Sequence, residues 1–122
     1  MLFENPETVL SDQQIAEIAY STLQGLSHLH KNKIVHNNIK SDNIILGNGV
    51  KISDFTYSEI LEKNGGKSTF PKLRGTINFM APERLIKDEK YDFLADIWSF
   101  GIFLIELIEG EPILNHQTNE VI

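Results

Sequence analysis

The first clear pattern along the chain is an amphipathic stretch that begins near residue 11. Ser11 followed by Gln14 has the form of a capping box, and Leu10 is placed to staple onto Ile15. The basic run at 31–33 suits the negative end of a helix dipole. The pattern predicts a helix ending there, with one apolar face formed by Ile15, Ile18, Ala19, Leu23, Leu26 and Leu29.

A shorter pattern follows and predicts a small β structure. Residues 34–35 are apolar and extended, and the polar run 36–43 has the composition of a loop. Two apolar runs, 44–46 and 50–52, flank Gly-Asn-Gly, whose residues tolerate positive φ. We therefore predict a β-hairpin directly after the loop.

The second half of the chain carries one strong helical signal. Residues 53–82 show no periodicity, which predicts a long irregular segment of the functional or mobile kind. Pro82 is suited to the first position of a short helix. A long helix is predicted from about Leu94 to Glu109, closed by Gly110. Because it is apolar all round, we expect it to form the buried centre of the fold.

Composition restricts the class of protein. The 122 residues are 41% hydrophobic and 23% charged, as in one small globular domain spanning 1–122. A net charge of −6 disfavours nucleic acid and anionic membrane surfaces as partners. No signal peptide is visible, and the apolar run 93–108 is shorter than the roughly 20 residues needed to span a bilayer. The absence of cysteine fits a reducing compartment, so we expect a cytoplasmic protein.

Four strings, in this order along the chain, resemble the signature motifs of protein kinases. Residues 34–46 (IVHNNIKSDNIIL) resemble the catalytic loop, and 53–56 (SDFT) resemble the D-F-G motif. Residues 75–83 (GTINFMAPE) resemble the end of an activation segment, and 96–101 (DIWSFG) the start of the central helix of the large lobe. Within the family the chain is most similar to the PAK-like branch of the STE group of serine/threonine kinases. The implied fold is mainly α with a small β-hairpin, a partial large lobe without the small lobe.

The resemblance also shows where the chain departs from the family. The family's catalytic carboxylate, which orients the attacking hydroxyl, falls at Asn38, and an uncharged amide cannot accept the hydroxyl proton. Asn37 replaces the arginine that receives the activation-segment phosphate, and Thr56 replaces the glycine of D-F-G. We therefore expect an inactive chain with a broken phosphate switch, even if Ser68 or Thr69, the candidate phosphorylation sites, were modified.

Other positions match the family's ATP and Mg²⁺ machinery. Lys40 matches the lysine that neutralises the transferred phosphate, and Thr76 the residue that bridges toward the catalytic loop. Ile45 matches the apolar floor under adenine, while Asn43 and Asp54 match the two metal ligands. The alternative for Asn43 and Asp54 is that they only brace the loop by hydrogen bonds.

The remaining matches have structural roles in the family. His36 and Phe55 resemble members of the packed column that links the lobes, and Asp96 the buried carboxylate that accepts catalytic-loop N–H groups. Glu83 pairs in the family with an arginine from a later helix. Trp98 lies in the central helix, whose incomplete cover predicts marginal stability and an exposed apolar patch.

Glu106 stands where kinases of basic substrates pair a substrate arginine, with a plain structural role as the alternative. The sequence shows no G-x-G-x-x-G loop and no strand lysine, so we expect weak or no binding of Mg-ATP. Three functions stay open. The chain is an inactive pseudokinase module that binds a protein partner, part of an active serine/threonine kinase, or a degenerate product without function.

Overall fold

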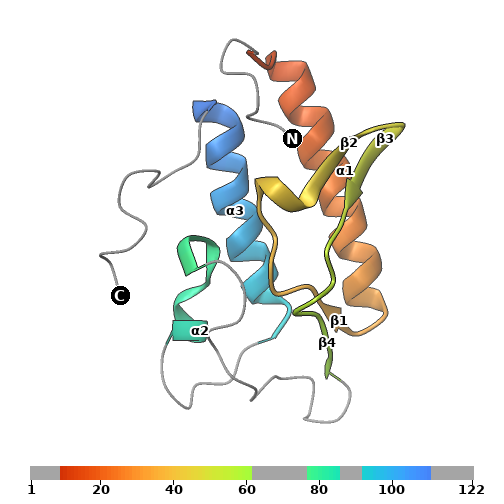
Figure 1. Cartoon of the computed structure of the whole chain (residues 1–122), viewed down its shortest axis with the longest axis vertical. Helices are drawn as coiled ribbons and strands as arrows, with labels where there is room; N and C mark the ends of the chain where they lie inside the picture. The colour runs from red at the N-terminus through yellow and green to blue at the C-terminus, as the bar shows by residue number, and fades with distance from the viewer. Residues whose placement is uncertain (1–8, 62–76, 86–91, 111–122) are drawn as a thin grey trace.

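A computed structural model describes residues 9–61, 77–85 and 92–110. Two long helices, α1 (Asp12–Lys31) and α3 (Leu94–Glu109), lie side by side and run in opposite directions (Figure 1). Two small antiparallel sheets and three short helical turns complete the described part. The predicted fold class, mainly helical with a small β component, is confirmed. The short elements are β1 (Ile34–Val35), η1 (Ser41–Asn43), β2 (Ile44–Gly47), β3 (Gly49–Ile52), β4 (Glu59–Ile60), η3 (Ile77–Phe79) and α2 (Pro82–Leu85).

Helix α1 begins and ends where the sequence predicts. The capping box is formed in both directions, because Gln14 N–H donates to Ser11 Oγ at 3.1 Å and Ser11 N–H donates to Gln14 Oε1 at 2.8 Å. Its last residue is Lys31, and Asn32 forms the C-cap. The capping box therefore fixes the start of the helix, and packing of its apolar face on the core stabilises it.

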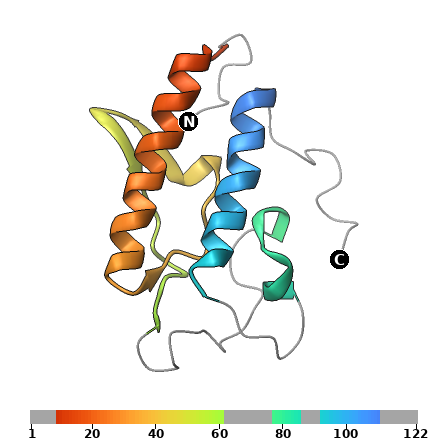
Figure 2. The same cartoon turned by 180° about the vertical axis from the view of Figure 1, so that it is seen from behind.

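The predicted hairpin is confirmed and packs against α1. Its register pairs Ile44 with Ile52 and Gly47 with Gly49, and Gly49 turns the chain at φ 90°. Gly25 of α1 lies against β3, and a Cβ there would lie 2.9 Å from Ile52 Cδ1, so the end of the Ile52 side chain would have to move. Figure 2 shows α1 and the hairpin from behind.

The sequence missed strand β4. β4 pairs with β1, with Ile34 opposite Ile60, and Leu61 N–H extends the contact by donating to Lys33 O at 2.9 Å. The expectation of an irregular segment throughout 53–82 is therefore wrong at 59–60. Two residues are too few to show the alternation that marks a strand, and the pairing depends on a partner 24 or more positions earlier.

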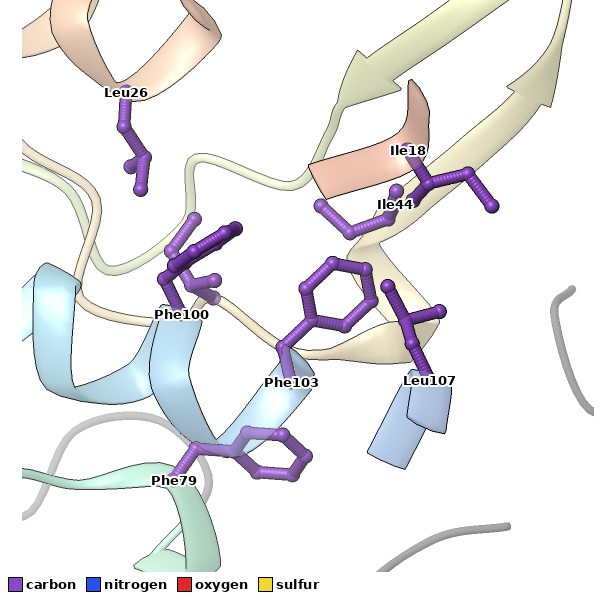
Figure 3. Close-up of a cluster of buried hydrophobic side chains, with 8 residues drawn as sticks. Ile18, Leu26, Ile44, Phe79, Phe100, Phe103 and Leu107 are labelled. Atoms are coloured by element: carbon purple, nitrogen blue, oxygen red, sulfur yellow. The ribbon is translucent and has the colours of Figure 1, made fainter. Parts of the chain in front are cut away.

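The core lies between α1, α3 and the hairpin. Phe100, Phe103 and Leu107 of α3 meet Ile18 of α1 and Ile44 of β2, as the close-up in Figure 3 shows. The cluster consists of Ile18, Leu26, Ile39, Ile44, Phe79, Phe100, Phe103 and Leu107. None of the helices in the described ranges is long and apolar enough to cross a membrane.

Helix α3 is buried on one face only, so the expectation of burial all round is wrong. Trp98 is 47% exposed and Leu94 67% exposed, whereas Phe103 is fully buried. The helix nevertheless has the predicted bounds and ends at Gly110 with φ 80°. Its buried face also carries two carboxylates, Asp96 and Glu106. Leu94 and Trp98 therefore belong to a partly exposed apolar face of α3.

Candidate functional site

Asp96 fixes the start of the kinase-like loop onto α3. Its Oδ2 accepts the backbone N–H of His36 at 2.8 Å, and its Oδ1 accepts that of Asn37 at 2.9 Å. The sequence placed Asp96 in this position, but it missed His30, whose Nε2 lies 3.0 Å from Asp96 Oδ2. Asp96 is 1% exposed, so the loop's N–H groups replace water as its partners.

Asn37 occupies a backbone conformation that suits an asparagine. Its φ is 72°, in the left-handed region that Asn tolerates better than most residues. Its buried amide donates from Nδ2 to Tyr57 O at 2.9 Å and to Glu59 Oε2 at 3.2 Å. The residue at the family's arginine position thus ties the loop to the β1–β4 pair without any phosphate.

Arg84 reaches the same point from α2 and was missed by the sequence analysis. Its Nη1 donates to the carbonyl of Asn37 at 3.0 Å, and the side chain is 1% exposed. A charged residue in a short polar helix gives no sign in the sequence that it will be buried. Its neighbour Glu83, expected to pair with a later arginine, is half-buried.

Asn38, at the position of the catalytic carboxylate, is buried in the loop. It is 6% exposed, its N–H donates to His36 Nδ1 at 3.1 Å, and its carbonyl accepts from Asn43 Nδ2 at 2.8 Å. His36 Nε2 lies 2.9 Å from Ser53 O, so the contacts fit the neutral imidazole with its proton on Nε2. The His36 ring also meets the Phe55 ring edge-on, with centroids 5.1 Å apart.

Asp54 and Thr56 form a closed local turn in the D-F-G-like motif. Asp54 has φ 59°, and its Oδ1 accepts both the N–H of Thr56 at 3.2 Å and the Thr56 hydroxyl at 2.5 Å. Hydrogen bonds from the Thr56 side chain and then from its backbone hold the pKa of Asp54 below its ordinary value. The carboxylate is exposed and ionised at neutral pH.

The remaining predicted site residues are Asn43, which is bonded within the loop, and Lys40 and Ile45. Asn43 is 6% exposed, and its carbonyl accepts from Ser53 N and Ser53 Oγ at 2.8 and 3.0 Å. Lys40 Nζ lies 4.0 Å from Asp42 Oδ2, and Ile45 of β2 is 51% exposed. The predicted Thr76, Ser68 and Thr69 lie outside the described residues.

The described residues meet the magnesium site that the family implies only in part. Asp54 Oδ1 already accepts two hydrogen bonds, and Asn43 Nδ2 donates to Asn38 O, so Asp54 Oδ2 and Asn43 Oδ1 are the oxygens that would meet a metal ion. Across 9–61, 77–85 and 92–110, no group of three or more His, Asp or Glu side chains is placed to hold a metal ion.

Glu106 is turned toward the loop. It is 2% exposed and accepts the Ser41 hydroxyl at 2.7 Å, which fixes η1 onto α3. The alternative of a structural role fits this burial, and the pairing with a substrate arginine does not.

Comparison with known proteins decides the family. A family model described as "Protein kinase domain" matches residues 2–122. The chain belongs to the protein kinase family. It is 45% identical over 115 residues to the serine/threonine-protein kinase CLA4 of Candida albicans, and 48% identical over 105 residues to shk1/pak1 of Schizosaccharomyces pombe. These alignments cover 91% and 84% of this kinase-family chain but 11% and 16% of the relatives.

A solved structure agrees with the sequence relatives. A chain of the yeast RNA Pol II CTD kinase CTDK-1 complex matches with a TM-score of 0.83 and 29% identity, covering 93% of this chain and 37% of that one. The predicted resemblance to PAK-like serine/threonine kinases and to their large lobe is confirmed. The kinase-family chain spans about a tenth to a sixth of the length of these curated relatives.

Proposed function

We propose that this kinase-family chain does not transfer phosphate and acts as a protein-binding pseudokinase module. The observation that carries the proposal is Asn38, an amide where the family's reaction uses a carboxylate. An amide has nearly the shape of a carboxylate but no charge and no site for the hydroxyl proton. Loss of a general base lowers a rate by roughly 10²–10⁴-fold.

The surroundings of Asn38 support a structural role for the loop. A carboxylate at a position that is 6% exposed carries a desolvation cost that a neutral amide avoids. The contacts of Asn38 with His36 and Asn43 brace the loop from within. Asn43, Asp54, His36, Phe55 and Asp96 then serve as scaffold, and the family's ATP and Mg²⁺ bind weakly or not at all.

The position of Asn37 supports the same proposal for regulation. The family has an arginine here that binds a phosphate once the activation segment is modified. In this chain the Asn37 amide instead donates to Tyr57 and Glu59. Residues 57–59 are therefore bonded to the loop without modification. A contact that needs no phosphate suits a binding module, and we place its protein partner in the cytoplasm.

A phosphate-transfer assay tests the proposal. Radiolabelled ATP and a basic acceptor protein are incubated with the wild-type chain, the Asn38→Asp variant and the Lys40→Ala variant. We expect no transfer by the wild type. Transfer by the wild type that Lys40→Ala abolishes would overturn the proposal, because it requires turnover through this loop.

An active kinase of which this chain is one part is the second candidate. The identity of 45–48% to serine/threonine kinases and the presence of Lys40, Asn43 and Asp54 favour it. The longest natural product of the gene, assayed with and without Asn38→Asp, separates the two. Restoring the carboxylate raises the rate by roughly 10²–10⁴-fold if the remaining machinery is present.

Nucleotide binding is measured separately from turnover, as the shift in melting temperature on adding Mg-ATP. We expect no change in the melting temperature of the chain.

A further inference from the structure

Thr56 replaces the glycine of the D-F-G-like motif and donates twice to one oxygen. Its N–H lies 3.2 Å from Asp54 Oδ1, and its hydroxyl lies 2.5 Å from the same atom. A carboxylate oxygen offers about two lone-pair positions. Both positions on Oδ1 are therefore taken by a residue two places along the chain, while a glycine would offer the N–H alone.

We propose that the Thr56 hydroxyl takes the place of a divalent cation at Asp54, so that this motif holds its shape without metal and binds Mg²⁺ poorly. The two hydrogen bonds from Thr56 occupy Oδ1 of Asp54 and leave only Oδ2 to coordinate a cation. Mg²⁺ requires near-octahedral oxygen geometry and gives up its waters reluctantly, so a single free oxygen is a weak site.

Among the neighbouring residues, Asn43 offers a side-chain oxygen, but a buried one. The residue is 6% exposed, and its Nδ2 donates to Asn38 O. Lys40 acts on Asp54 as a positive charge, which opposes a cation. The hydroxyl hydrogen of Thr56 occupies a position at this carboxylate that a metal ion or a water hydrogen would otherwise occupy.

This inference rests on the proposed function and deepens it, because it gives a structural reason for the weak Mg²⁺ binding expected there. It predicts that metal binding is limited by one hydroxyl group. Thr56→Val keeps the β-branched shape and removes the hydroxyl, whereas Thr56→Ser keeps the hydroxyl and removes the methyl group. The two variants separate the hydrogen bond from the shape of the side chain.

The experiment is a Mn²⁺ titration of the isotopically labelled chain, followed by the paramagnetic broadening of amide signals of residues 53–57. Mn²⁺ alone is the probe, and circular dichroism checks that each variant keeps its helices. The wild type and Thr56→Ser should show the same weak broadening. Thr56→Val should bind Mn²⁺ roughly tenfold more tightly, since a hydrogen bond to a charged acceptor no longer competes. Adding Asp54→Asn to Thr56→Val should remove the gain.

Two results would overturn the inference: broadening of the wild type as strong as that of Thr56→Val, or no gain in Thr56→Val while its helices are intact. Neither result bears on phosphate transfer. A wild type that transfers phosphate would conversely disprove the proposed function without deciding how Thr56 and Asp54 interact.

Discussion

The Oδ1 atom of Asp96 accepts the backbone N–H of Asn37 at 2.9 Å, and these residues are 59 positions apart in the chain. The other oxygen of Asp96 accepts the N–H of His36. One buried carboxylate in α3 therefore sets the path of the loop that carries Lys40 and Asn43.

Asp96→Asn is expected to lower the free energy of unfolding by about 3 kcal/mol, because one loop N–H loses its acceptor and the other loses a charged one. Urea unfolding monitored by Trp98 fluorescence measures the change. Asp42→Asn is the matched control, since Asp42 lies in the same loop with its side chain 63% exposed, and it should change stability by less than about 0.5 kcal/mol. Equal effects of the two substitutions would contradict the role of Asp96.

Asn37 tests the left-handed backbone position. Asn37→Ala loses the bonds to Tyr57 and Glu59 and places a Cβ at φ 72°, whereas Asn37→Gly loses the same bonds without the strain. Alanine should therefore be less stable than glycine by about 1–2 kcal/mol. Thermal unfolding of the two variants compares them directly. Equal melting temperatures would show that the backbone is not strained there.

The same position tests whether the phosphate switch is restored by a single change. Asn37→Arg puts a guanidinium into a site that is 2% exposed and beside the buried Arg84. We expect a loss of stability and no gain of phosphate transfer. An active Asn37→Arg variant would show that the loop has kept the rest of its machinery.

Asp54 has a defined pH dependence. Hydrogen bonds from Thr56 lower its folded-state pKa, so the turn is stabilised above the unfolded pKa and loses this stabilisation as pH falls through the folded one. Thr56→Val removes the largest cause and should raise the Asp54 pKa toward its ordinary value. Carboxyl-carbon NMR over an acid titration measures it. Thr56→Ser should titrate as the wild type does, and a wild-type Asp54 with an ordinary pKa would contradict the contact.

The exposed apolar face of α3 should bind a hydrophobic dye. A cavity of about 600 Å³ between α1 and the start of α3 is lined by Leu26, Phe93 and Ile97, and Ile97 is 43% exposed. We expect anilinonaphthalene sulfonate to fluoresce with the wild-type chain and clearly less with Ile97→Lys. Lys51→Gln, on the exposed side of β3, is the control. A sharp cooperative melt without dye binding would disprove the expected marginal stability.

The elements that depend on neighbours in sequence were predictable. The cap at Ser11, the hairpin around Gly49 and the end of α3 at Gly110 all depend on side chains or backbone angles within a few residues. The order of the four motifs indicated the kinase family, and the family in turn placed Asp96 under the loop. Local signals of this kind survive in a single sequence because each needs only a short stretch of chain.

Three other long-range contacts were decided by the tertiary structure. Glu106 turns inward to Ser41 across 65 positions, Arg84 reaches Asn37 across 47, and β4 finds β1. Nothing near any of these residues in sequence indicates its partner, because the partner is brought there only when α1, α3 and the loop pack together. The sequence itself determined which groups the chain has, including the amide at Asn38. Packing decided which of them face one another, since a buried polar group must find its acceptor or donor inside the fold.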